Sequence, residues 1–106
     1  MPDFTDMLSK AKEMQVKMKD AQDAIKNIEV EGEAGGNLVK VILTGDYEIK
    51  AIIVNEEAKK ETNGIVNDLI IAAYNNAKEK LKKKSSEELL KATGGMNLPF
   101  DLKFPF

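Results

Sequence analysis

The feature that most constrains this fold is a long heptad repeat of apolar residues near the start of the chain. Between residues 7 and 28 the apolar positions recur at alternating spacings of four and three. This spacing places a narrow apolar stripe along one side of a helix, as in a coiled coil. We therefore predict a helix over residues 1–28 and a dimer that forms through these helices, through the edges of the sheet predicted below, or through both. The predicted dimer-interface residues are Met7, Ala11, Met14, Met18, Ala21 and Ile25.

The length of this helix supports the prediction of a dimer. A chain of 106 residues fits a single domain, which we place at 1–106. If it were compact, its radius of gyration would be about 13 Å. About 25 helical residues span about 37 Å, so the helix would cross the whole monomer or project beyond it.

The period of the sequence changes from helical to alternating over residues 28–54. Val39, Val41 and Leu43 share one face of a predicted strand, and glycine-containing turns at 34–37 and 45–46 bracket it. The following strand would place its odd-numbered residues on one face, and these are Tyr47, Ile49, Ala51 and Ile53. The pattern predicts a three-stranded antiparallel meander.

A second helical region is predicted over residues 62–93. Its apolar stripe runs from Ile65 to Leu81, and we expect this stripe to be buried. The helix that carries it should end near the lysine run at 78–84. Ser85 and Glu88 have the spacing of a capping box, which predicts that a short helix restarts there. A tail at 94–106 contains prolines and phenylalanines. The predicted fold class is α+β, an α-β-β-β-α subunit with two long helices flanking the meander.

Catalytic chemistry has few residues to draw on. The chain contains no histidine and no cysteine, which removes the commonest acid–base group, metal ligand and thiolate. Ser85 and Ser86 lie beside a lysine run, but helix capping explains them better than a serine–lysine dyad. Glutamates alternate along residues 29–33, a pattern more typical of a solvated strand face than of a cation site. We expect no catalytic residues, metal, cofactor or small-molecule substrate.

Lysines gather on both predicted helices. All 16 basic residues are lysine, and the net charge of −2 is spread unevenly, with an acidic middle and a basic end. These lysines either form a solvated surface or contact the phosphates of DNA. Without arginine, the bidentate contact to guanine is missing, so we expect little sequence preference. The candidate DNA-binding residues are Lys10, Lys12, Lys17, Lys19, Lys78, Lys80, Lys82, Lys83 and Lys84.

Four strings resemble the YbaB/EbfC family of bacterial nucleoid-associated proteins. They are MLSKAKEMQVKMKDAQ, VEGEAGGNLVKVILTGDYEI, DLIIAAYNNAKEK and GGMNLPFDLKFPF, in order along nearly the whole chain. The resemblance implies a tweezers-shaped homodimer that binds double-stranded DNA with low specificity in the cytoplasm and nucleoid, bending or bridging it and modulating gene expression. It also implies no enzymatic activity and no cofactor. In the family the corresponding basic positions are often arginine.

One alternative from a different class stays open. Two long helices flanking β-hairpins are also similar to prefoldin-like holdase chaperones or assembly adaptors. In that case Met7, Met14 and Met18 would form an adaptable client surface rather than a dimer seam. The first ten residues are acidic and lack an apolar run, so we expect neither a signal peptide nor a membrane partner.

Overall fold

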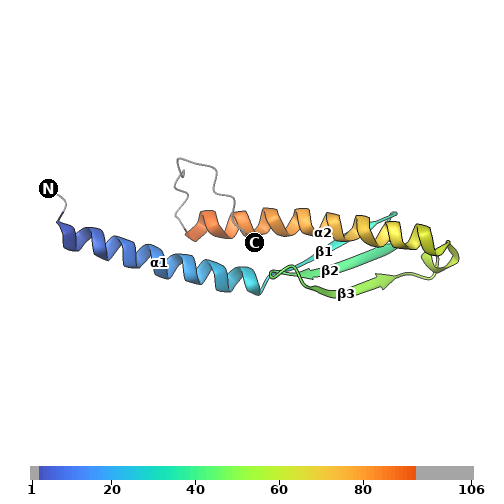
Figure 1. Cartoon of the computed structure of the whole chain (residues 1–106), viewed down its shortest axis with the longest axis horizontal. Helices are drawn as coiled ribbons and strands as arrows, with labels where there is room; N and C mark the ends of the chain where they lie inside the picture. The colour runs from blue at the N-terminus through green and yellow to red at the C-terminus, as the bar shows by residue number, and fades with distance from the viewer. Residues whose placement is uncertain (1–2, 93–106) are drawn as a thin grey trace.

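The computed structural model describes residues 3–92 and has the predicted α-β-β-β-α order (Figure 1). One long helix, α2, covers one face of a three-stranded sheet, the other, α1, packs on α2, and a single 3-10 turn joins the last strand to α2. The elements are α1 Phe4–Lys26, β1 Glu29–Ala34, β2 Val39–Thr44, β3 Ile49–Val54, η1 Ala58–Lys60 and α2 Asn63–Ala92. The predicted tail at 94–106 lies outside the described residues.

Helix α1 has clear start and stop signals. The Asp3 carboxylate accepts a 3.5 Å hydrogen bond from the amide of Thr5, and Asp6 adds negative charge in the first turn. Both features favour the amino-terminal end of a helix. At the other end, the amide of Asn27 donates to the carbonyl of Ala24 at 3.2 Å and closes the last turn. Residues 4–26 can therefore form a helix of about 35 Å.

The sheet is an antiparallel meander in the order β1-β2-β3. Val39, Val41 and Leu43 on β2 are fully buried beneath α2, as their alternation predicts. A register shift beside Leu43 makes Leu43 face Ile49, whereas Ile42 faces Ala51. Ile49 and Ala51 therefore lie on opposite faces. The prediction of one shared face therefore holds for Ala51 and Ile53 but is wrong for Ile49, because the bulge inserts an extra residue.

The turn between β2 and β3 is tight and partly buried. Tyr47 has φ 62°, in the left-handed region, and its amide donates to the carbonyl of Thr44 at 2.9 Å. Its ring packs against the core cluster that contains Leu43 and Leu81. Burial raises the pKa of the Tyr47 hydroxyl above its ordinary value, and the nearby Tyr74 raises it further. The turn is thus part of the core rather than a solvated loop.

Helix α2 is continuous, which corrects the predicted break at the lysine run. Thr62 caps its start by accepting a 3.3 Å hydrogen bond from the amide of Ile65. Ile65 itself is 46% exposed, so its predicted burial is wrong. Ser85 lies in the middle of α2, is 3% exposed and does not cap a new helix. Its small side chain belongs to a buried line along α2 in which every fourth residue is buried, namely Ala73, Ala77, Leu81, Ser85 and Leu89. Tertiary packing along this line overrides the local capping pattern.

Two glycines let the elements approach closely. A Cβ atom at Gly32 on β1 would overlap the carbonyl oxygen of Ala73 and the backbone of Ala77 on α2. A Cβ atom at Gly45 in the β2–β3 turn would overlap the carbonyl oxygen of Ile25 at the end of α1. These contacts hold α2 against the sheet and the end of α1 against the turn.

The molecule is a rod of 70 × 23 × 17 Å with a radius of gyration of 19.1 Å. At one end α2 covers the sheet, and further along it packs against α1 (Figure 1). Ala21 and Ile25 of α1 are buried there against Leu89 of α2. The first half of α1 projects past the end of α2 (Figure 1). We call residues 4–16 of this projection the arm.

Candidate nucleic-acid interface

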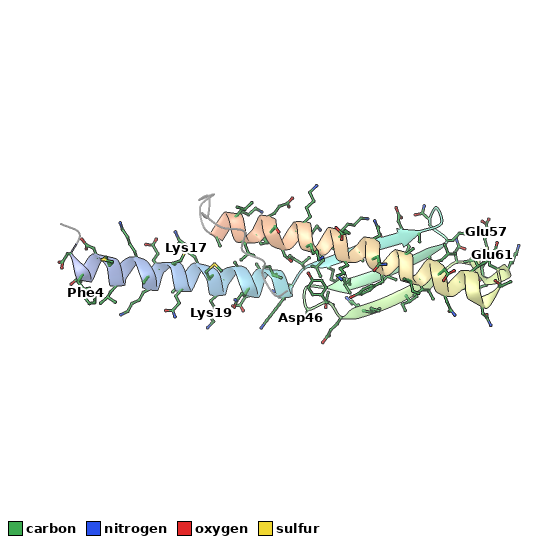
Figure 2. All side chains as sticks on the ribbon, turned by 45° about the horizontal axis from the view of Figure 1, so that its top comes forward. Phe4, Lys17, Lys19, Asp46, Glu57 and Glu61 are labelled. Carbon is green, nitrogen blue, oxygen red and sulfur yellow. The ribbon has the colours of Figure 1, made fainter. Side chains whose placement is uncertain are left out.

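The structure divides the nine predicted DNA-binding lysines between two helices and several surfaces. Four lie on α1 and five on α2, and all except the partly buried Lys78 are exposed. Lys17 and Lys19 point to opposite sides of α1 (Figure 2). The nine lysines therefore do not form one continuous basic face, and each group has its own electrostatic surroundings.

The lysines on one flank of α2 face the acidic strand β1. A groove between the two elements is lined by Lys80, Lys83 and Lys84, together with Glu29, Glu31 and Glu87. Nζ of Lys80 donates a hydrogen bond of 2.9 Å to the backbone carbonyl of Glu31. The carboxylates lower the positive potential of this flank, since opposite charges within a few ångströms offset each other.

The other flank of α2 carries Lys78 and Lys82. Each directly follows a residue of the buried line, Ala77 or Leu81, whereas Lys80 and Lys84 directly precede one. The two pairs therefore lie on opposite sides of that line. Within the range that the structure describes, neither Lys78 nor Lys82 forms an ion pair.

Lys17 lies in a second mixed-charge region. Its ammonium group is 3.3 Å from the carboxylate of Glu13, one turn earlier on α1. It also lines a groove between α1 and α2 that contains Asp20, Glu88 and Lys91. Such an exposed pair contributes under about 1 kcal/mol to stability, so it does not prevent Lys17 from contacting a phosphate.

A further basic surface is a row along α1 that we call the lysine stripe. Lys12, Lys19 and Lys26 are seven residues apart, close to two helical turns, so they lie above one another. All three are exposed, and none forms an ion pair with any residue from 3 to 92. Sequence reasoning missed Lys26, although its heptad spacing from the other two was a usable signal.

The outer face of the sheet is unsuited to phosphate. Glu29, Glu31 and Glu33 alternate along β1 and are exposed on that face. Lys50 pairs with Glu29, and Lys40 lies 3.7 Å from Glu31. Among the described residues, no three acidic side chains converge in a group that could hold a metal ion.

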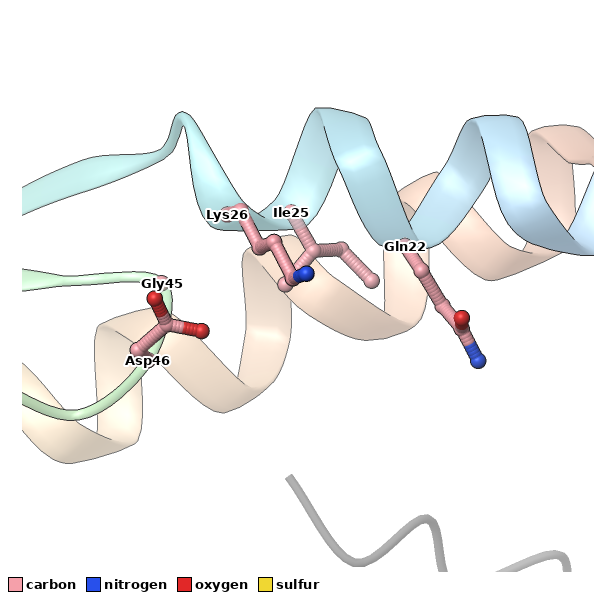
Figure 3. A pocket seen from close by; sticks show the side chains of 5 residues that line it. All are labelled: Gln22, Ile25, Lys26, Gly45 and Asp46. Carbon is pink, nitrogen blue, oxygen red and sulfur yellow. The ribbon is translucent and has the colours of Figure 1, made fainter.

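A small hollow of about 130 Å³ lies where α1 meets the β2–β3 turn (Figure 3). Gln22, Ile25 and Lys26 line it from α1, and Gly45 and Asp46 line it from the turn. The Asp46 carboxylate and the Lys26 ammonium both lie at this end of the lysine stripe (Figure 3). The lining residues include no nucleophile with an adjacent base, so they offer no catalytic arrangement.

The fold and these surfaces define a class of protein. It is an elongated α-β-β-β-α subunit whose helices carry exposed lysines, and the ammonium groups of these lysines can bind a polyanion. The model of the YbaB/EbfC DNA-binding family matches residues 1–96. The chain belongs to this family, which is one of DNA-binding proteins and not of enzymes.

Relatives agree with this assignment, and a solved structure shares the fold. The chain is 41% identical over 107 residues to the nucleoid-associated protein mlr5504 of Mesorhizobium japonicum, covering 100% of both chains. It is 42% identical to the nucleoid-associated protein Atu0095 of Agrobacterium fabrum, again covering 100% of both. The crystal structure of the uncharacterized Helicobacter pylori protein HP0035 superposes with a TM-score of 0.71 at 14% identity, covering 87% of this chain and 98% of that one.

Neither α1 nor α2, the helices found in the described part of the chain, combines the length and the apolar character needed to cross a bilayer.

Proposed function

We propose that this protein is a nucleoid-associated protein of the bacterial cytoplasm that binds double-stranded DNA as a homodimer. Lysine ammonium groups contact phosphates, and sequence preference is low. The lysine stripe of Lys12, Lys19 and Lys26 carries the proposal, because it is exposed and free of ion pairs within residues 3–92. The family and the names of the relatives support DNA as the partner.

The predicted lysines then take different parts in binding. Lys12 and Lys19, joined by Lys26, make the primary contacts along α1. The ammonium groups of Lys10, Lys78, Lys82, Lys83 and Lys84 add long-range attraction to the duplex. Lys17 can leave its ion pair with Glu13 and contact a phosphate instead, because an exposed pair of this kind contributes little to stability. Lys80 differs from the others, because its hydrogen bond to β1 gives it a structural part.

Low specificity follows from the chemistry of lysine. Its ammonium group is a compact point charge on a flexible stem, unlike the planar fork of arginine that reads guanine. Such contacts supply affinity and orientation on the duplex but carry no direct sequence information. We therefore expect similar affinities for unrelated duplexes of equal length.

The dimer contact is best placed at strand β3. The other edge strand, β1, is partly capped by α2, because Asn76 accepts a 3.1 Å hydrogen bond from the amide of Glu33 and Lys80 donates to Glu31. Strand β3 has no such cover in the described chain and exposes apolar side chains along its open edge. These are Ile49, Ile52 and Ile53, which are 48%, 46% and 46% exposed. An apolar open edge favours pairing with another chain.

The interface predicted on α1 is less well supported by the burial of its residues. Ala21 and Ile25 are already buried against α2 of the same subunit, and Met18 packs on their cluster. Met7 and Ala11 are exposed, and Met14 and Met18 are partly buried. An Ile52→Lys substitution tests the two placements: by sedimentation it should give a monomer if β3 forms the contact, and leave the dimer intact if α1 does.

A dimer would carry two lysine stripes and two arms. Two phosphate-binding surfaces on one particle can contact two duplex segments or two turns of one duplex, which bridges or bends DNA and so modulates transcription.

A second candidate function is client binding by a holdase, favoured by the exposed Phe4, Met7 and Val16 on the arm.

Fluorescence anisotropy with a labelled random duplex between about 50 and 300 mM salt tests the proposal. Phosphate contacts predict that log affinity falls linearly with log salt, with a slope of about 0.9 per contact. Absence of binding at the lowest salt would refute it. A salt-independent suppression of client aggregation would then favour the holdase.

A further inference from the structure

The arm of α1 exposes an apolar surface that the sheet and α2 do not cover. Phe4, Met7 and Leu8 are 71%, 58% and 48% exposed. Along the heptad pattern, this surface continues through Ala11 and Met14. Contiguous apolar side chains of this kind on a soluble protein mark a surface that another chain segment covers.

The end of α2 brings the rest of the chain to this surface. Ala92, the last residue of α2, packs on the α1–α2 cluster formed by Ala21, Ile25 and Leu89. Met18 packs on the same cluster, and it is the point where the heptad stripe leaves the core and enters the arm. Residues 93–106 therefore continue from the inner end of the exposed stripe.

The composition and length of the carboxyl-terminal segment fit this stripe. The sequence MNLPFDLKFPF, residues 96–106, contains three phenylalanines and two leucines, and its single aspartate and single lysine cancel in charge. From Met18 to Phe4 the stripe runs about 21 Å. The 14 residues after Ala92 can reach about 46 Å when extended, so they can follow the whole stripe with slack.

We infer that residues 96–106 dock along the apolar stripe of the arm in the same chain. Phenylalanine rings on methionine side chains make favourable sulfur–aromatic contacts, and Met7 and Met14 offer such partners. A second arm packed in parallel is disfavoured as the occupant, because Asp3 and Asp6 would bring like charges together where the two arm tips met. The inference is independent of DNA binding.

The absence of native cysteine allows a direct test in the full-length chain. Met7→Cys places one thiol on the stripe, and Ser9→Cys places one on the opposite side of the same helix, at an exposed position, as a matched control. Each thiol is titrated with a small alkylating reagent, alone and with the tail substitutions Phe100→Ser, Phe104→Ser and Phe106→Ser. Circular dichroism checks that every variant keeps its helix content.

Docking predicts that the thiol at position 7 reacts several-fold more slowly than that at position 9. It also predicts that the tail substitutions remove this difference without changing the rate at position 9. The protection should not vary with protein concentration, because the contact lies within one chain. Equal rates at both positions overturn the inference, as does protection that survives the tail substitutions or grows with concentration, which would assign the stripe to a second copy.

Discussion

Nζ of Lys80 lies 2.9 Å from the backbone carbonyl oxygen of Glu31, so one of the predicted DNA-binding lysines fastens α2 to β1. Asn76, one turn earlier, makes a second contact of this type with the amide of Glu33 at 3.1 Å. Both bonds satisfy backbone groups of an edge strand. Lysines of one cluster can thus have different tasks, and the two tasks can be separated by mutation.

Lys80→Gln should lower stability more than Lys84→Gln, although both remove one positive charge. The first variant loses a hydrogen bond to the backbone, whose net contribution is about 0.5–1 kcal/mol. The Lys84 side chain is exposed and forms no hydrogen bond or ion pair with any residue from 3 to 92. Urea unfolding followed by circular dichroism measures the difference, and equal midpoints would contradict the structural part given to Lys80.

Reversing the charge of the lysine stripe should abolish most DNA binding. We expect Lys12→Glu, Lys19→Glu and Lys26→Glu together to weaken affinity more than tenfold and to lower the salt slope by about 1 per lysine. The matched control is Lys40→Glu, Lys59→Glu and Lys60→Glu, which changes the net charge equally on the sheet and η1. Anisotropy titrations compare them. Equal losses in the two variants would mean that net charge, not the stripe, governs binding.

Gly32→Ala should destabilise the subunit strongly. The added methyl group would overlap the backbone of Ala73 and Ala77, so α2 would have to move away from β1. Overpacking of this kind costs about 1–3 kcal/mol, and a clash with backbone lies at the upper end. Gly64→Ala is the control, because a Cβ there meets nothing within 4 Å. Its effect on thermal unfolding should be neutral or stabilising, and equal effects of both substitutions would argue against the close packing.

Ser85→Ala should stabilise the protein by about 1 kcal/mol, because the buried Ser85 hydroxyl has no hydrogen-bond partner in the described structure. A capping serine would behave in the opposite way, since its loss costs about 1 kcal/mol. Denaturant midpoints therefore separate a continuous α2 from a broken one. Ser86→Ala, at the neighbouring exposed position, should have little effect.

Stability should fall in strongly alkaline solution, partly through Tyr47. Burial raises the pKa of its hydroxyl above the ordinary 10.0, so the unfolded chain loses this proton at a lower pH than the folded chain. The Tyr47 contribution is complete below pH 10 and is lost as the pH rises through the folded pKa. Tyr47→Phe should flatten this part of the pH profile, as measured by chemical denaturation. An unchanged slope would contradict the shift.

The sequence predicted the element order because each element has a clear period and clear turns. The heptad spacing of α1 indicated an apolar stripe but not what covers it. In the structure Leu89, more than sixty residues away along the chain, covers Ala21 and Ile25. Periodicity reports that a face is apolar, and only tertiary structure identifies its partner.

Two further differences have equally local causes. The bulge in β3 depends on how two strands pair, so the alternation of residues 47–54 alone could not reveal that Ile49 and Ala51 face apart. Ser85 and Glu88 match a capping pattern, yet burial of Ser85 on the packed side of α2 decides the outcome. In the candidate site, lysine positions were readable from the sequence, but their carboxylate neighbours on β1 were not.

The 70 Å length of the rod has a consequence for how densely the protein can cover a chromosome. One turn of B-form duplex is about 34–36 Å long, so a molecule lying lengthwise spans about two turns. Its footprint is then fixed by the rod's own dimension rather than by the number of contacts. Neighbouring molecules on a crowded duplex would compete for about 20 base pairs each, and partial overlap would be excluded sterically.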